Sequence, residues 1–303
     1  MLRTILLYLS ERDGPRKLLT STAAGRRLAA RFIAGEDLED AIRVVHGLNA
    51  EGFDATLDYL GESVREPATA SAASGAYLRL LDRLGEEKLR ANISIKLTQL
   101  GLAIHEDLAQ AHLLEIIQRA MAHKIFVRID MEGSAYTEST LRILRHCDAP
   151  REALGAVIQA ALYRSAKDLE DLLARGVRVR LVKGAYKEPA EIAYPRQADV
   201  DANFVRLMKR LLESGGYHAI ATHDSEMIAA TEAFACERGL GPDRFEFQML
   251  YGIRRQLQRQ LLRRGGRVRI YVPYGRQWYS YFMRRLAERP ANLLFLLRNI
   301  FRA

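Results

Sequence analysis

Cysteine is scarce in this sequence, and metal-binding motifs and long apolar runs are missing. Cys147 and Cys236 stand far apart without metal-type spacing, so neither a disulfide framework nor a zinc site is indicated, and a reducing cytoplasm fits best. No His-x-His, His-Glu-x-x-His or paired-carboxylate spacing occurs, so we expect no metal. The apolar run Thr4–Leu9 is too short for a signal peptide, and no stretch approaches the roughly 20 apolar residues that span a bilayer. We therefore expect a cytoplasmic protein that is not an integral membrane protein.

Positive charge exceeds negative charge, with a formal net charge of +9. The most basic run is Arg254–Arg264, in which leucines recur at helical spacing. Three interpretations of this run stay open: a solvated helix with one packed face, a contact with a membrane surface, or a nucleic-acid contact. Because no aromatic stripe, zinc finger or RNP-type motif accompanies the run, we expect no nucleic-acid partner.

Short apolar segments rich in β-branched residues alternate with longer segments of helical periodicity. The alternation predicts a parallel sheet with helical crossovers, and eight repeats favour closure into a barrel. The competing architecture, an open Rossmann-type sheet, calls for a Gly-x-Gly-x-x-Gly turn, which is absent, as is a P-loop. The expected strands are Ala55–Leu60, Asn92–Leu97, Ile125–Met131, Ala156–Leu162, Val177–Val182, Ala219–Thr222, Phe245–Met249 and Val268–Val272. Expected helices include Glu106–Ala122, Ser139–His146, Lys167–Leu173, Asp201–Glu213, Ser225–Arg238 and Arg254–Arg264.

The predicted fold is therefore an α/β (β/α)8 TIM barrel with additional N-terminal helices. The chain has 303 residues, and such barrels reach about 250 residues or more as one domain. We assign residues 1–45 to N-terminal helices that pack on the barrel, and residues 46–303 to the barrel and its C-terminal helix. After the last strand, Gln277–Glu288 is predicted to be a helix that Pro290 stops, and Asn292–Ile300 a short cap helix.

Each expected strand from the second to the eighth carries polar residues that a packed core would not select. In barrels of this kind, active sites lie at the carboxyl ends of the strands. One such residue alone is more often a helix cap or an ion-pair partner, but seven strands converging on one face favour a site. The residues are Lys96, Asp130, Gln159, the pair Arg178 and Arg180 with Lys183, the run Thr222–Asp224, Gln248 and Tyr271.

The helix after the eighth strand carries two adjacent arginines on a polar face. Tyr281, Arg284, Arg285 and Glu288 follow the i, i+3, i+4, i+7 spacing of one helical face. Two adjacent guanidiniums can bind one carboxylate through paired hydrogen bonds, and Glu288 is placed to orient them. The alternative is a surface helix with i,i+4 ion pairs. Because Lys96 is expected to face the same cavity, we favour a small anionic substrate.

Several segments, in order along the chain, strongly resemble the proline dehydrogenase family, and most closely its short monofunctional bacterial members. The resemblance runs from about residue 45 to the end, and the length leaves no room for the aldehyde dehydrogenase module of the bifunctional form. It rests on Ile95–Gly101, Leu181–Tyr186, Ala221–Asp224, Phe245–Gly252, Tyr271–Gly275 and the Tyr281-x-x-Arg284-Arg285-x-x-Glu288 helix.

The resemblance implies a distorted (β/α)8 barrel that binds FAD non-covalently and oxidises L-proline to Δ1-pyrroline-5-carboxylate. It implies that Arg284, Arg285 and Lys96 bind the proline carboxylate and that Tyr281 packs over the ring. Asp130 and Tyr271 would line the substrate pocket, with Arg180 beside N5 of the flavin. The residues expected to hold the cofactor are Met131, Gln159, Arg180, Lys183, Gly184, Ala185, Thr222 and His223.

The resemblance also implies partners for the reaction. Electrons would pass to a quinone in the inner membrane, with Arg254–Arg264 as a candidate peripheral contact, and a separate pyrroline-5-carboxylate dehydrogenase could take the product. Two rival interpretations remain. One is a flavin barrel similar to methylenetetrahydrofolate reductase that reduces an imine with NADH, which would not need the Arg284–Arg285 pair. The other is a basic, non-enzymatic barrel without cofactor, against which the intact polar strand ends argue.

Overall fold

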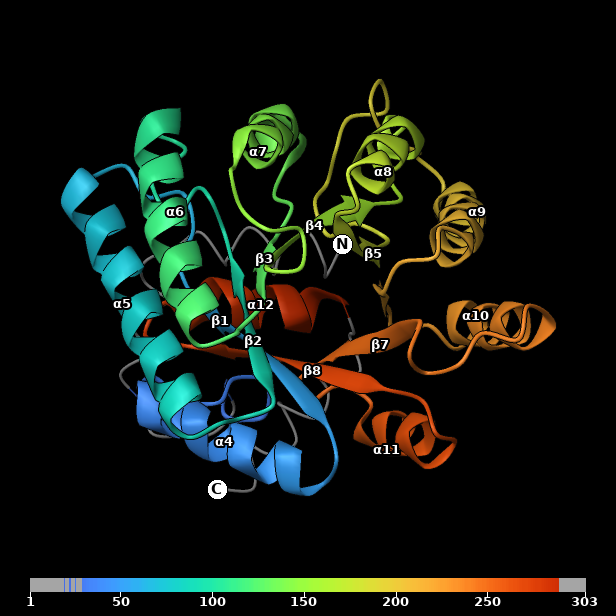
Figure 1. Cartoon of the computed structure of the whole chain (residues 1–303), viewed down its shortest axis with the longest axis horizontal. Helices are drawn as coiled ribbons and strands as arrows, with labels where there is room; N and C mark the ends of the chain where they lie inside the picture. The colour runs from blue at the N-terminus through green and yellow to red at the C-terminus, as the bar shows by residue number, and fades with distance from the viewer. Residues whose placement is uncertain (1–18, 20–21, 23–24, 26–28, 289–303) are drawn as a thin grey trace.

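Eight parallel strands close into one barrel in the order in which they occur in the sequence (Figure 1). The computed structural model describes residues 19, 22, 25 and 29–288. The strands are β1 Asp54–Tyr59, β2 Ala91–Ile95, β3 Val127–Ile129, β4 Leu154–Gln159, β5 Arg178–Val182, β6 His218–Ala221, β7 Phe245–Leu250 and β8 Val268–Tyr274. The predicted barrel and all eight expected strands are confirmed, with ends that differ by a few residues.

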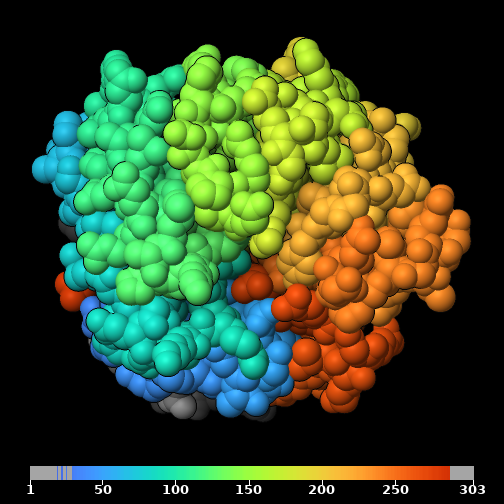
Figure 2. Space-filling view, viewed as in Figure 1, coloured from blue at the N-terminus to red at the C-terminus, as the bar shows by residue number. Residues whose placement is uncertain are grey.

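A helix follows each strand, and successive strand–helix units follow one another around the molecule (Figure 2). The helices are α4 Leu38–Ala50, α5 Pro67–Glu86, α6 Glu106–Ala122, α7 Ser134–His146, α8 Ser165–Ala174, α9 Gln197–Glu213, α10 Ser225–Glu237, α11 Arg255–Arg263 and α12 Trp278–Glu288. The expected helices α6 to α12 are confirmed, although α7 begins at Ser134 rather than Ser139. Helix α5 was not among them. It buries Tyr77, Leu80, Leu81 and Leu84, one face of a helix, against the barrel.

The ring of helices departs from a regular barrel at its closure. Helix α4, which precedes β1, packs on both β1 and β8 and so takes the place that the helix after β8 would fill. Helix α12 instead crosses the middle of the ring, behind the strands in Figure 1. The boundary drawn between residues 45 and 46 therefore lies inside α4, and the division into two parts stays a prediction. The predicted cap helix Asn292–Ile300 lies outside the described residues.

The interior of the barrel is polar as well as apolar. Branched apolar side chains usually fill the interior of such barrels. Here Arg128, Arg180, Glu246 and Gln248 are buried on inward-facing strand positions, beside apolar residues such as Val157. Buried charges are costly unless they are paired and hydrogen-bonded. This interior is therefore organised by its hydrogen bonds, and these lead to the carboxyl ends of the strands.

Candidate active site

A cavity of about 420 Å³ opens at the carboxyl ends of the strands, beside α12. Its wall receives side chains from around the barrel, so residues far apart in the sequence meet there. Every residue that is expected to bind the substrate or the cofactor lies on this wall: Lys96, Asp130, Met131, Gln159, Arg180, Lys183, Gly184, Ala185, Thr222, His223, Tyr271, Tyr281, Arg284 and Arg285. The structure brings these residues together; their individual roles stay predictions.

Lys96 lies at the cavity beside a carboxylate that was not predicted, Asp58. Its Nζ donates to both oxygens of Asp58, at 2.7 and 2.8 Å, and Asp58 is completely enclosed on β1. Burial alone would lower the pKa of Lys96, but the charges of Asp58 and Asp130 outweigh it and hold that pKa above its ordinary value. Lys96 is therefore a fixed cation. The signal for Asp58 was the alternation of Thr56, Leu57 and Asp58 along β1, which places a second carboxylate in the interior.

Asp130, on the cavity wall, is hydrogen-bonded to two side chains that extend from the barrel interior. Its Oδ1 accepts from Arg180 Nη1 at 2.6 Å, and its Oδ2 accepts from the hydroxyl of Tyr271 at 2.7 Å. The Arg180 guanidinium also lies 5.4 Å from the centre of the Tyr271 ring. Burial, and then the negative charge of Asp130, raise the pKa of Tyr271, so its hydroxyl stays protonated and donates. The three side chains form one rigid unit that faces the cavity.

Two arginines of α12, Arg284 and Arg285, line the cavity. Arg284 Nη1 donates to Glu62 Oε1 at 2.6 Å, and Nη2 is 3.3 Å from Oε2. The Arg285 guanidinium lies 5.2 Å from the centre of the Tyr281 ring, which is buried. The side chain of Glu288, which was expected to orient the two arginines, lies outside the described residues. Glu62 was not predicted, because its partner is more than two hundred residues away and no local signal marks it.

The segment that follows β5 contributes exposed backbone and a lysine to the wall of the cavity. Lys183 Nζ lies 2.6 Å from carboxylate oxygens of both Asp201 and Asp224, so its charge is already countered within the protein. Gly184 has a φ of +120°, and a Cβ there would lie 3.0 Å from the Cβ of Ala161. The chain therefore presents bare backbone at this point of the cavity.

The remaining wall residues are held by backbone contacts. Gln159 Nε2 donates to the carbonyl oxygen of Glu132 at 3.0 Å, and Thr222 Oγ1 accepts from the backbone N–H of Asp224 at 3.1 Å. His223 Nε2 accepts from the backbone N–H of Leu250 at 2.9 Å. These bonds fix the side chains on rigid strand ends, which suits a preformed binding site.

Two kinds of feature are absent from the part of the chain that the structure describes. Among those residues, no helix combines the length and the apolar character that a membrane crossing needs. No group of three or more His, Cys, Asp or Glu side chains in the same residues is arranged to hold a metal ion.

The family model of proline dehydrogenase matches residues 41–298, which includes every strand of the barrel and α12. The chain belongs to the proline dehydrogenase family. It is 44% identical over 301 residues to proline dehydrogenase 1 of Bacillus subtilis, covering 99% of both chains. It is 41% identical over 278 residues to the proline dehydrogenase of Deinococcus radiodurans, covering 90% of both. It is thus an oxidoreductase of proline catabolism.

Longer relatives share the barrel. The bifunctional protein PutA of Escherichia coli is 29% identical over 325 residues, which covers 91% of this chain and 24% of PutA. The crystal structure of proline utilization A from Bdellovibrio bacteriovorus, inactivated by N-propargylglycine, matches with a TM-score of 0.83 at 26% identity. That match covers 95% of this chain and 36% of the other. The closed barrel is therefore shared with the solved structure of proline utilization A.

Proposed function

We propose that the chain oxidises L-proline to Δ1-pyrroline-5-carboxylate by passing a hydride to N5 of a non-covalently bound FAD, the first step of proline degradation to glutamate. One observation carries the proposal: a single cavity is lined both by cations, among them Lys96, Arg284 and Arg285, and by bare backbone at Gly184. The cations suit a small carboxylate, and the rest of the cavity suits a larger, flat ligand.

The residues present fit a flavin. Val157, Val182 and Met249 give part of the wall an apolar surface, against which a flat ring can pack. Polar side chains that stand around it in the same cavity suit the edges of the ring and the phosphates: Gln159, Lys183, Thr222 and His223. Met131 and Ala185 complete the set that we propose to hold FAD. When bound, FAD would supply the hydride acceptor, because no side chain can accept a hydride.

The chain's own residues bind and orient the substrate. Arg284 and Arg285, with Lys96, bind the proline carboxylate by charge-assisted hydrogen bonds and so fix the position of the ring. Tyr281 packs over that ring, and Asp130 and Tyr271 line the pocket. Arg284 shares its charge with Glu62 until the substrate arrives. Lys96 stays cationic through Asp58, so its attraction for the carboxylate does not vary around neutral pH.

Arg180 supplies the electrostatic contribution. Its guanidinium is hydrogen-bonded to Asp130 and lies over the Tyr271 ring in the barrel interior, and the residue is buried. A fixed cation in a water-excluded site stabilises negative charge that develops during a reaction, without reorganisation of solvent. We propose that Arg180 stabilises the charge that the flavin gains when it is reduced.

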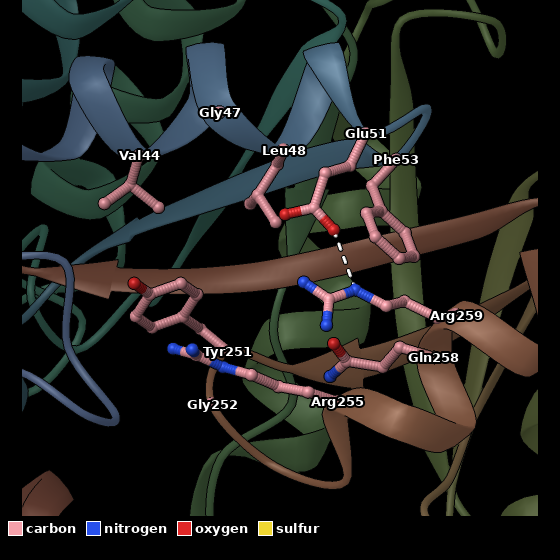
Figure 3. A pocket seen from close by; sticks show the side chains of 10 residues that line it. All are labelled: Val44, Gly47, Leu48, Glu51, Phe53, Tyr251, Gly252, Arg255, Gln258 and Arg259. Carbon is pink, nitrogen blue, oxygen red and sulfur yellow. Dashed lines mark hydrogen bonds and ion pairs between the residues drawn. The ribbon is translucent and has the colours of Figure 1, made fainter.

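The reduced cofactor must then lose its electrons. We propose a quinone of the cell membrane as the acceptor, with the protein cytoplasmic and peripheral on the inner face of that membrane, and a separate pyrroline-5-carboxylate dehydrogenase as the next enzyme. Helix α11 is the candidate contact. A groove of about 210 Å³ lies between α4 and α11. In Figure 3, Arg259 turns toward Glu51 and Arg255 lies beneath Tyr251. Two of the arginines of α11 thus already have partners within the protein: Arg259 pairs with Glu51, and Arg255 lies on the Tyr251 ring.

The spectrum of the purified protein tests the central proposal. We would record the visible absorbance anaerobically before and after adding L-proline. A flavin band that bleaches with L-proline and not with NADH supports the proposal. A band that bleaches only with NADH contradicts the substrate, and no band after addition of FAD contradicts the cofactor. For α11, binding to anionic vesicles that does not weaken with salt or with Arg263→Glu would contradict the membrane contact.

A further inference from the structure

A chain of side-chain hydrogen bonds runs inside the barrel, away from the cavity. Arg180 Nε donates to Gln248 Oε1 at 2.5 Å, and Gln248 Nε2 donates to Glu246 Oε1 at 2.5 Å. The exposed fractions of these three residues are 4%, 3% and 2%, so water does not compete for the bonds. Only Arg180 and Gln248 line the cavity, whereas Glu246 lies below it on β7. These hydrogen bonds therefore link a residue of the cavity wall, Arg180, to a residue that no substrate can touch, Glu246.

The charges at the two ends determine how the amide in the middle is oriented. An arginine guanidinium only donates hydrogen bonds, and an ionised carboxylate only accepts them. Gln248 lies between one of each, so its NH2 group has to face Glu246 and its oxygen has to face Arg180. If Glu246 were neutral, the amide could turn over and present NH2 to the guanidinium. That arrangement would leave Arg180 Nε without an acceptor.

Glu246 is held ionised by its own partners. Its Oε1 accepts from Arg269 Nε at 2.8 Å, and its Oε2 accepts from the Tyr217 hydroxyl at 2.8 Å. Arg269 in turn donates to the backbone oxygen of Ala55 at 2.8 Å. Burial would raise the pKa of Glu246, but the charge of Arg269 and these hydrogen bonds outweigh it and lower that pKa. The carboxylate is therefore a fixed anion.

The third bond completes the restraint on Arg180. Its Nη1 is bound to Asp130 at 2.6 Å and its Nη2 to Ser94 at 2.9 Å. These two bonds hold the far edge of the guanidinium, and the bond from Nε to Gln248 fixes the plane about its long axis. A buried ion pair such as Glu246–Arg269 is weak evidence for stability, since well-packed apolar residues often replace such pairs without loss. Its placement here suits a role in orientation.

We infer that Glu246 is a positioning residue for Arg180, acting through the amide of Gln248. The inference rests on the proposed function, in which Arg180 stabilises the reduced cofactor. A cation held at a fixed place favours the reduced, more negative flavin and raises its reduction potential. If the guanidinium loses one hydrogen bond, it can occupy several positions, and it then raises the reduction potential less. The residues that bind the substrate carboxylate keep their positions.

The experiment measures the flavin potential in the full-length holoenzyme, by photochemical reduction with reference dyes and without proline. The variants are Glu246→Gln and Gln248→Met; the second leaves the Glu246–Arg269 pair intact and so guards against a folding defect in the first. The control is Glu170→Gln, which removes an exposed carboxylate paired with Arg210. We expect each test variant to shift the reduction equilibrium at least tenfold toward oxidised flavin, about 30 mV for two electrons. The control should shift it by less than twofold.

A double-mutant comparison separates positioning from a general disturbance. In an Arg180→Met background, Gln248→Met should cause no further shift of the potential, because the residue through which it acts is gone. When Arg180 is present, Gln248→Met should change the KM for proline by less than about twofold relative to the wild type, while kcat falls. Equal potentials in folded variant and wild-type protein, or an additive shift in the Arg180→Met background, would overturn the inference. A wild-type flavin that ignores proline would overturn only the proposed reaction, and a chain that takes up no FAD would overturn both.

Discussion

Arg284 of α12 and Glu62, in the segment between β1 and α5, are joined across the mouth of the barrel, with Arg284 Nη1 2.6 Å from Glu62 Oε1. Both side chains are about one third exposed. The guanidinium that we propose to bind the substrate carboxylate thus has a carboxylate partner within the protein. A substrate must therefore compete with Glu62 for Arg284.

We expect Glu62→Gln to lower the KM for proline by up to about fivefold, with kcat little changed. A partly exposed ion pair is worth about 0.2–1 kcal/mol, and that free energy no longer opposes substrate binding in the variant. Steady-state kinetics at several proline concentrations provide the measurement. Glu66→Gln, an exposed glutamate at the start of α5 that makes no side-chain cap, is the control. A higher KM in Glu62→Gln would show instead that Glu62 holds Arg284 in its binding position.

We expect Arg285→Met to raise the KM for proline sharply and to lower kcat/KM. Removing one partner of a buried, charge-assisted contact typically costs about 2–5 kcal/mol, and the apolar chain of methionine still packs on Tyr281. The control is Arg276→Met, since Arg276 is 79% exposed and lies just before α12. An unchanged KM in Arg285→Met would remove Arg285 from the carboxylate site.

The sequence was sufficient for the barrel, because its signals are local and repeat eight times. Strand alternation also identified the polar residues of β2 to β8, such as Lys96 and Gln159. It did not separate α5 from its surroundings, because the first half of that helix is rich in alanine and serine and its apolar periodicity starts only at Tyr77. Asp58 on β1 was within reach of the same alternation and was overlooked.

Other parts of the site depend on contacts between distant segments, which one sequence does not contain. Glu62 meets Arg284 only because α12 crosses the barrel mouth instead of joining the ring. Lys183 forms ion pairs with two carboxylates that come later in the sequence, Asp201 in α9 and Asp224 at the start of α10. Composition and periodicity cannot give such pairings, because they follow from how the helices pack after the barrel has closed.

Acid should destabilise the protein through His218, which lies outside the cavity. Its Nδ1 accepts from the backbone N–H of Val179 at 3.1 Å, so the ring is neutral, with its other nitrogen 2.8 Å from Ser214 Oγ. Burial, and then the charges of Arg128, Arg178 and Arg244, lower the pKa of His218 to about 4. The unfolded chain takes up this proton near pH 6.5, while the folded chain does not until about pH 4. The stability that the folded protein has with a neutral His218 is therefore fully present above pH 6.5, and it is lost as the pH falls from 6.5 to 4.

The expected loss from this one group is about 3 kcal/mol at pH 4, from the difference between the two pKa values. Urea unfolding at pH 7.0 and pH 4.0 measures it. His218→Asn keeps an acceptor for Val179 and removes the titrating group, so the free energy of unfolding should vary less with pH than in the wild type. His105→Asn, an exposed histidine at the start of α6, should keep the wild-type dependence. The same dependence in His218→Asn would assign the acid sensitivity to other groups.

Gly184 should be needed for the cofactor more than for the fold. Its φ of +120° disfavours any side chain, and a Cβ would lie 3.0 Å from Ala161 and 3.5 Å from Gln159 Oε1, at the cavity wall. Gly176 also has a positive φ, +69°, but a Cβ there meets nothing within 4 Å. We expect Gly184→Ala and Gly176→Ala each to lose roughly 1 kcal/mol of stability from backbone strain. Only Gly184→Ala should also purify with less bound flavin, by at least about fivefold in the absorbance ratio. Equal flavin content in the two variants would show that the backbone at Gly184 does not approach the cofactor.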